Sequence, residues 1–105
     1  MPLVKVESHE QFDELIKRDR CVVDFSATWC APCKKLLSNM DKVFEYCDDI
    51  TVAKVDVNEL DDIAEAFNVN SIPHIVFFKD GQLEEKYLKS SDYEILIDRI
   101  KDIYK

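Results

Sequence analysis

Two cysteines separated by two residues, Cys30 and Cys33, are the side chains of this chain best suited to chemistry. Pro32 lies between them and favours the first turn of a helix, where its missing N–H would be unpaired anyway. The two thiols therefore lie where an apolar strand leads into a helix, the context in which C-x-x-C indicates a redox motif. Unpaired N–H groups and the helix dipole stabilise an anion at such an N-terminus, so a thiolate is favoured at Cys30.

This spacing predicts thiol-disulfide exchange. The Cys30 thiolate attacks a substrate disulfide, and Cys33, one turn further in and expected to be more buried, resolves the mixed disulfide. Cys33 must lose its proton at that step. Asp24 is the one carboxylate in the apolar strand 21–25, and burial would raise its pKa toward the working range, so we predict that it is the base, acting through a water. The alternative is a carboxylate satisfied by local hydrogen bonds at a strand end.

A zinc site is the main alternative for the cysteine motif, and it needs two more ligands. The remaining candidates, which are scattered and not paired at ligand spacing, are Cys21, Cys47, His9 and His74. We therefore predict no metal. Unpaired cysteines usually behave as small apolar residues, which is the role expected for Cys21 and Cys47. A regulatory or intermolecular disulfide through either one stays open.

Length and composition exclude several classes of function. The 105 residues, 47% of them hydrophobic, are enough for one domain with its own core, which we place at residues 1–105. A formal net charge of −8 argues against nucleic acid and anionic membranes as partners. The sequence begins without a secretory signal pattern and has no apolar run of membrane-spanning length, so we expect a cytoplasmic protein. We also predict that it is a monomer. With a single glycine there is no Gly-rich phosphate loop, so we expect no organic cofactor.

Hydrophobic periodicity predicts an alternation of strands and helices. The expected strands are 4–6, 21–25, 50–57, 75–78 and 83–88, and the expected helices are 8–16, 32–47, 58–67 and 92–104. Ser8 and Asn58 are candidate N-caps, and Asp80-Gly81 suits a hairpin turn between the last two strands. We therefore predict an α/β fold: a central mixed sheet of about five strands with four helices on both faces.

Three motifs together resemble the thioredoxin family over essentially the whole chain. They are Val22-Val23-Asp24-Phe25, then Trp29-Cys30-Ala31-Pro32-Cys33-Lys34, then Ser71-Ile72-Pro73 before the strand 75–78. The resemblance implies a thioredoxin fold in which Pro73 is cis and lies beside the cysteines. It also implies that the Ile72 backbone pairs with an extended substrate segment and that Trp29 flanks the active site.

The same resemblance implies that Lys54 lies near Asp24 and tunes it, although a strand lysine is more often an exposed residue with a buried stem. Four positions depart from the family pattern. Ala31 replaces a glycine and should change the motif little. Ser38 replaces a helix-kinking proline, so we expect a straighter helix.

The other two departures lie near the expected docking surface. His74 follows the predicted cis proline, and we assign it to substrate binding together with Ile72 and Pro73. It either carries charge near the thiolate or is an ordinary exposed loop histidine, the latter being expected. Lys89 replaces a small glycine and would add bulk and positive charge where partners approach.

The predicted function is that of a protein-disulfide reductase, which carries electrons from a thioredoxin reductase-like protein to disulfide-containing targets. One alternative is a more oxidising oxidase or isomerase. The lack of a signal sequence and a proline, not a basic residue, directly before Cys33 count against it. The other alternative is a docking module with incidental cysteines.

Overall fold

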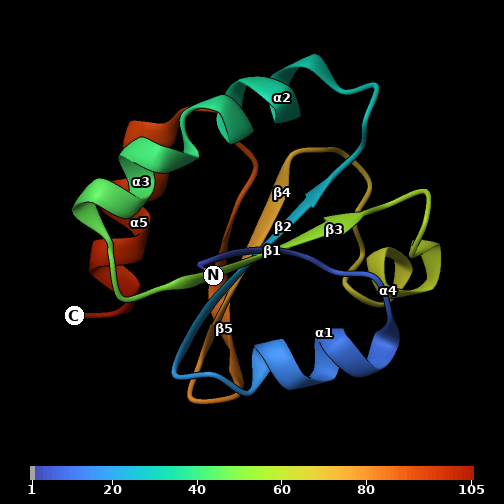
Figure 1. The fold of residues 1–105 in the computed structure, drawn as a ribbon, viewed down its shortest axis with the longest axis horizontal. Helices are drawn as coiled ribbons and strands as arrows, with labels where there is room; N and C mark the ends of the chain where they lie inside the picture. The colour runs from blue at the N-terminus through green and yellow to red at the C-terminus, as the bar shows by residue number, and fades with distance from the viewer. Residues whose placement is uncertain (1) are drawn as a thin grey trace.

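Five strands form one sheet in the computed structural model, which describes residues 2–105 (Figure 1). The strands are β1 (Leu3–Lys5), β2 (Arg20–Ser26), β3 (Thr51–Asp56), β4 (His74–Lys79) and β5 (Gln82–Leu88). The helices are α1 (His9–Ile16), α2 (Ala31–Ser38), α3 (Met40–Tyr46), α4 (Asp61–Ala66) and α5 (Tyr93–Ile103). Met1, with which the predicted domain begins, lies outside the described residues.

Strand β2 lies at the centre of the sheet, whose order is β1-β3-β2-β4-β5. It is parallel to β3 and antiparallel to β4, so the predicted mixed sheet is confirmed. The predicted hairpin between β4 and β5 is also confirmed, and its turn residues Asp80 and Gly81 have φ values of 52° and 81°. A two-residue turn with positive φ at both positions matches the strand twist, which places the single glycine of the chain here.

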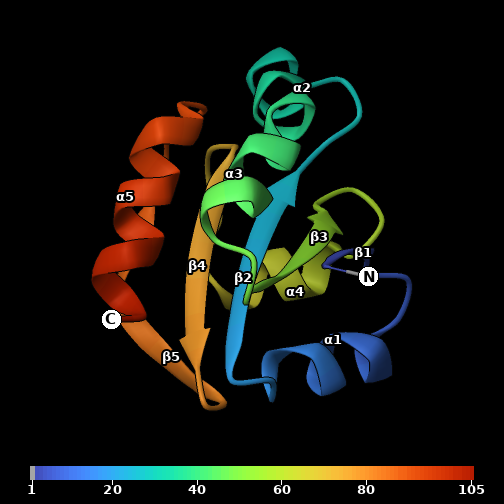
Figure 2. The ribbon, with the colours of Figure 1, turned by 60° about the vertical axis from the view of Figure 1, so that its left-hand side comes forward.

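Helices cover both faces of the sheet, as predicted. Figures 1 and 2 show α2, α3 and α5 on one face and α1 and α4 on the other. Alternate residues of β2 enter two separate cores: Val22 packs with α2, α3 and α5, and Val23 and Phe25 pack with α1 and α4. A central strand covered on both faces must be apolar on both sides of its pleat, so a polar side chain in β2 is conspicuous.

The two predicted helix caps have different outcomes. Ser8 caps α1 by accepting a 3.1 Å hydrogen bond from the Gln11 N–H, as predicted, and Asp92 caps α5. The prediction that Asn58 caps the next helix is wrong, because α4 begins only at Asp61. Asp56 supplies the local oxygen instead: its carboxylate accepts from the Asn58 N–H at 2.8 Å and forms a turn before the helix.

The predicted helix over 32–47 is two helices, α2 and α3, which meet at Asn39. The expectation of a straighter helix without proline at position 38 is therefore wrong. Ser38 Oγ and Asn39 Nδ2 both donate to the carbonyl oxygen of Lys35, at 2.7 and 3.1 Å. Side chains that bond to helix carbonyls compete with the backbone ladder and bend helices, so this polar pair interrupts the helix in place of a proline.

Tyr104, immediately after α5, ties the end of the chain to the middle of the sheet. Its buried hydroxyl lies 2.8 Å from the carbonyl oxygen of Phe78 in β4 and 3.2 Å from that of Cys21 in β2. Burial raises the pKa of Tyr104 well above its usual range, so the hydroxyl keeps its proton and donates it to these carbonyls. The last helix is thereby fixed against the two central strands.

Three segments that are distant in sequence meet at one end of β2. Phe25 pairs with His74 at the start of the antiparallel β4, and Ser26 pairs with Asp56 at the end of the parallel β3. The loop before α2, the loop before β4 and the turn after β3 must therefore lie close together. The cysteine motif, the predicted cis proline and Asn58 are carried by these three segments.

Candidate active site

Cys30 and Cys33 form a disulfide at the N-terminus of α2, with Cα atoms 5.3 Å apart. Cys30 is the N-cap of this helix, and Pro32 occupies its first turn, as predicted. Both cysteines are buried, at 4% and 3% exposed, so in this disulfide state their exposure hardly differs. The difference between them is positional: Cys30 precedes the helix and Cys33 lies inside its first turn.

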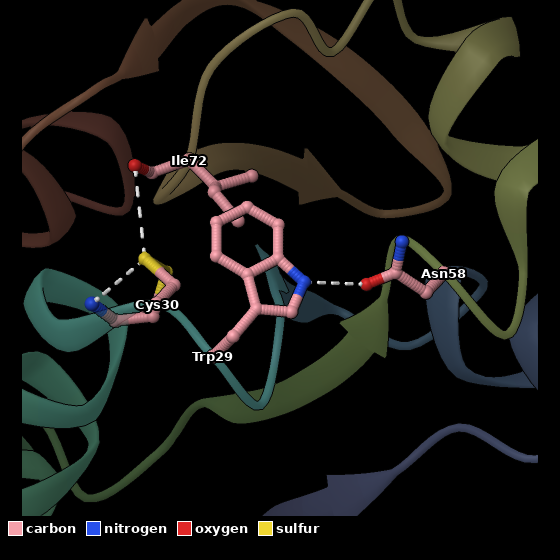
Figure 3. Close-up of a disulfide and its surroundings, with 5 residues drawn as sticks. Trp29, Cys30, Asn58 and Ile72 are labelled. Carbon is pink, nitrogen blue, oxygen red and sulfur yellow. Dashed lines mark hydrogen bonds between the residues drawn. A yellow bond between two sulfur atoms is a disulfide. The ribbon is translucent and has the colours of Figure 1, made fainter.

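The sulfur of Cys30 faces groups from two segments, as Figure 3 shows. It accepts a hydrogen bond from the Cys33 backbone N–H at 3.3 Å, and the carbonyl oxygen of Ile72 lies 3.9 Å away. The Ile72–Pro73 peptide bond is cis, which confirms the expectation from the family resemblance. The loop before β4 thus presents a backbone carbonyl at the sulfur of the helix N-cap.

Trp29 is the most exposed large apolar side chain at this end of the sheet, with 68% of its surface accessible. Its indole Nε1 donates a 2.9 Å hydrogen bond to Oδ1 of Asn58, and Figure 3 shows the ring turned toward that amide. Sequence reasoning assigned Asn58 to a helix cap and missed this contact. The pairing depends on β3 lying beside β2, which spacing along the chain does not reveal.

Asp24 lies in β2 on the face covered by α2, and only 2% of its surface is accessible. Its partner in the parallel register with β3 is Lys54, so the predicted proximity of the two is confirmed. Burial raises the pKa of Asp24 to about 6, an increase that the positive charge of Lys54 opposes. Among residues 2–105, no group forms a hydrogen bond with the buried Oδ1 of Asp24. The carboxyl group is therefore half-protonated near pH 6.

A cavity of about 200 Å³ lies beside Cys33. Its lining comes from the end of β2 and the loop after it, from the first turns of α2 and from one residue of β3, and it includes Ser26, Cys33, Leu37 and Lys54. Ser26 is a second polar side chain buried in β2, which the sequence reasoning overlooked. The signal that singled out Asp24, a polar residue in a strand apolar on both faces, applies equally to Ser26.

His74 is not the exposed loop residue that we expected. It is the first residue of β4 and only 5% exposed, because its ring lies between Phe25 and Tyr87, at centroid distances of 6.1 and 5.4 Å. Burial, and secondarily the charge of Lys89, lower the pKa of His74, so the ring is neutral at pH 7. Lys89 itself is exposed, and its ammonium donates to Asn70 Oδ1 at 3.1 Å.

Cys21 and Cys47 are both buried and, in the part of the chain that the structure describes, unpaired. Burial raises the pKa of Cys21 to about 11 and also raises that of Cys47. Cys47 lies in the core beneath α2, α3 and α5, and Cys21 lies in the core beneath α1 and α4. Both therefore have the apolar, structural role that we predicted.

No three potential metal-ligating side chains gather anywhere within residues 2–105. Over the same range, no helix is both long and apolar enough to cross a membrane.

Comparison with known proteins matches this geometry. A family model described as Thioredoxin covers residues 3–102. A thioredoxin from Chlamydia pneumoniae is 34% identical over 98 residues, which are 93% of this chain and 96% of that protein. The mitochondrial thioredoxin-3 of Saccharomyces cerevisiae is 39% identical over 87 residues, or 82% of this chain and 68% of that protein.

Solved structures agree in fold. The crystal structure of oxidised mitochondrial thioredoxin 3 from Saccharomyces cerevisiae superposes with a TM-score of 0.86 at 37% identity, covering 95% of this chain and 94% of that one. A thioredoxin from Trypanosoma brucei brucei gives a TM-score of 0.88 at 27% identity, over 97% and 90% of the two chains. The expected thioredoxin fold is thereby confirmed. With a matching family model, matching relatives and a disulfide at the start of α2, this chain belongs to the thioredoxin family.

Proposed function

We propose that this protein reduces disulfide bonds in other proteins by cycling Cys30 and Cys33 between dithiol and disulfide. One observation carries the proposal: the Cys30 sulfur is the N-cap acceptor of α2, bonded by the Cys33 N–H at 3.3 Å. The same N–H and the positive end of the helix stabilise a thiolate at Cys30 in the reduced protein. A stabilised thiolate is both the better nucleophile and the better leaving group in disulfide exchange.

The exchange proceeds in two steps. The Cys30 thiolate attacks one sulfur of the target disulfide, so that a Cys30–target bond forms and the other target sulfur leaves as a thiolate. Cys33 then loses its proton and attacks Cys30, which releases the second target sulfur and forms the Cys30–Cys33 bond. The cysteine pair is oxidised by two electrons and the target is reduced by two.

Asp24 is our candidate for the base that accepts the Cys33 proton. Its carboxyl group lies on the β2 face toward α2, and with a pKa of about 6 it is mostly ionised at pH 7 yet more basic than an exposed carboxylate. Lys54, its register partner, supports the ionised form through its positive charge. The proton would pass by way of a water in the cavity between β2 and α2.

The groups around Cys30 suit an extended peptide as the docking partner. The Ile72 carbonyl oxygen, 3.9 Å from the Cys30 sulfur, is placed to pair with a backbone N–H of a target strand. Trp29 offers exposed apolar surface on the other side of the disulfide. Pro73 is buried and supports this backbone. We assign substrate contact to Ile72 and Trp29, and not to the buried His74 ring.

We further propose that a separate reductase protein returns electrons to the disulfide, with no bound organic cofactor or metal. Each cycle consumes two electrons, and no other redox pair lies beside Cys30 and Cys33 in the described chain. We place the activity in the cytoplasm by analogy with the bacterial thioredoxins, while one other relative is named as mitochondrial. We also propose that the protein acts as a monomer.

The reduction potential of the Cys30–Cys33 pair tests the proposal. Equilibration with defined thiol buffers should give a potential of about −270 mV, the value characteristic of thioredoxin. A potential between about −180 and −120 mV would assign the protein to disulfide formation or isomerisation.

A Cys33→Ser variant separates catalysis from simple docking. Without the resolving thiol, Cys30 should remain joined to its targets as mixed disulfides that reducing agents release. A Cys30→Ser variant is the matched control and should trap nothing. If Cys33→Ser also trapped nothing, the cysteines would be incidental to the function.

A further inference from the structure

Ser26 is a buried hydroxyl that the proposed function has not used. Only 3% of its surface is accessible, and its Oγ forms no hydrogen bond with any group in residues 2–105. A hydroxyl buried without a partner costs free energy, and such groups usually bond to protein or to ordered water. Ser26 lies two residues after Asp24 in β2, so both side chains point to the same face of the sheet, toward α2.

The cavity of about 200 Å³ connects this hydroxyl to the resolving cysteine. Ser26 and Cys33 both line it, and so does Lys54. Asp24 neighbours two of the polar lining residues: Ser26 follows it on the same strand face, and Lys54 is its register partner in β3. The cavity therefore joins Cys33 to the two residues that neighbour Asp24, and it offers a route for a proton from Cys33 toward Asp24.

The two polar neighbours differ in what they can do with a proton. An ammonium group such as that of Lys54 only donates hydrogen bonds, whereas a serine hydroxyl donates and accepts at once. The cavity volume is ample for water molecules, which need about 30 Å³ each in the liquid. The hydroxyl of Ser26 is thus the group able to orient such a water between a thiol and a carboxylate.

We propose that Ser26 is a positioning residue for the resolving step, in which its hydroxyl and a cavity water link the Cys33 thiol to Asp24. This inference rests on the proposed disulfide exchange. In the step, the Cys33 proton passes to the water while a proton of that water, directly or through the Ser26 hydroxyl, passes to the Asp24 carboxylate. The Cys33 sulfur attacks Cys30, and the departing target thiolate takes its proton from solvent, so charge and atoms balance.

Other charged groups near this path are few. Lys54 in β3 favours the ionised carboxylate. Lys34 in α2 lines the same cavity. Asp56, which pairs with Ser26 in the register, has its carboxylate bonded to the Asn58 and Glu59 N–H groups. From β4 the register partner of Asp24 is the apolar Ile75. Asp24 is therefore the only carboxylate on the β2 face toward α2 that is placed to accept the proton.

Stopped-flow reaction of the reduced protein with Ellman's reagent isolates the step. The first coloured thiol is released when Cys30 attacks, at a rate that depends on reagent concentration. The second coloured thiol is released when Cys33 displaces it from Cys30, at a rate that is independent of reagent concentration. In Ser26→Ala the rate of the second phase should fall about tenfold above pH 6, which is less than the full rate enhancement that general-base catalysis supplies. The rate of this phase should also no longer depend on a group that titrates near pH 6. The first phase should keep its rate.

Two further variants make the test specific. Ser26→Thr restores a hydroxyl in a cavity with room for one methyl group, and it should recover the parental second phase and its pH profile. Thr28→Val removes a hydroxyl from the exposed edge of the same cavity and should leave both phases unchanged.

An unchanged second phase in Ser26→Ala would overturn the inference. So would an equally slow Ser26→Thr, because the effect would then come from packing and not from the hydroxyl. If the parent chain itself failed to release two thiols in sequence, the disulfide exchange would be wrong, and the inference with it. A normal first phase therefore distinguishes failure of the Ser26 role from failure of the function.

Discussion

The indole Nε1 of Trp29 donates a 2.9 Å hydrogen bond to Oδ1 of Asn58, which joins the loop before Cys30 to the turn after β3. The bond holds an otherwise exposed aromatic ring in one orientation beside the disulfide. We predict that Asn58→Leu, which removes the acceptor, raises KM for a protein disulfide several-fold. Without the bond the indole ring is mobile, and fixing its orientation when a target binds costs conformational entropy. The free energy of unfolding should fall by only about 1 kcal/mol.

Steady-state kinetics and the fluorescence anisotropy of the single tryptophan would measure these effects. Asn58→Asp keeps an acceptor oxygen and is the control, expected to behave like the parent. Parental anisotropy and KM in Asn58→Leu would show that the bond does not orient the ring.

Asp24 should make the oxidised protein less stable as the pH rises. The folded protein holds this proton more tightly than the unfolded chain, since burial raises the pKa from 3.8 to about 6. The contribution of Asp24 to stability is therefore greatest below about pH 4 and declines between about pH 4 and pH 6. Each tenfold difference in proton affinity is worth about 1.4 kcal/mol, so the decline approaches roughly 3 kcal/mol.

The variant Asp24→Asn has no such titration. Urea unfolding across this pH range should show the variant gaining stability relative to the parent, by roughly 2–3 kcal/mol between about pH 4 and pH 7.5. Parallel pH profiles of parent and variant would contradict the raised pKa.

Tyr104→Phe should destabilise the protein without altering its redox chemistry. The change removes the hydroxyl that lies 2.8 Å from the Phe78 carbonyl oxygen and leaves two buried carbonyls with one partner fewer. The expected loss is about 1–2 kcal/mol in chemical denaturation, with an unchanged reduction potential. Tyr46→Phe, at an exposed tyrosine, is the matched control and should change the stability by less than about 0.5 kcal/mol.

Gly81→Ala should cost about 1 kcal/mol through backbone conformation alone. Its φ of 81° is a region that side chains with a Cβ rarely adopt, whereas an added Cβ would approach nothing closer than the Lys17 Cα, 3.9 Å away. Gly81→Asn should cost less, since asparagine tolerates positive φ. Equal unfolding midpoints for the alanine and asparagine variants would argue against this conformational origin.

Cys21 and Cys47 should not react with thiol reagents while the protein is folded. Both are buried and burial raises both pKa values, so little thiolate forms at neutral pH. In a Cys30→Ser/Cys33→Ser double variant, Ellman's reagent should label neither thiol quickly in buffer and both in denaturant. Rapid labelling of one thiol in the folded state would support a regulatory disulfide at that position.

Much of the fold follows from local pattern. Alternating apolar residues placed the strands, and Ser8 and the Asp80-Gly81 pair placed a helix start and a hairpin, because caps and turns depend on side chains a few residues apart. The helix break at Asn39 escaped prediction for the opposite reason. The apolar stripe continues through both α2 and α3, so hydrophobic periodicity predicts one helix. The break comes from two side-chain hydrogen bonds to the Lys35 carbonyl oxygen, which do not change that periodicity.

The site was predictable in its thiols and not in their surroundings. Cys30, Cys33 and Asp24 stand out by residue type alone. The burial of His74 follows from the register that sets it opposite Phe25 in the next strand, and the role of Asn58 follows from β3 lying beside β2. Such contacts depend on sheet order, which a single sequence does not specify. Ser26 was within reach, because it interrupts the same apolar strand as Asp24.

The two outermost strands bear on how the protein behaves when concentrated. An outer strand leaves one row of backbone N–H and C=O groups unpaired and is a template on which a neighbouring molecule can extend the sheet. Strand β1 is only three residues long, and β5 carries Glu84, Glu85 and Lys86 in succession. Bringing two copies of β5 together would crowd like charges that water now solvates. The charges on β5 therefore disfavour extension of the sheet by a second molecule.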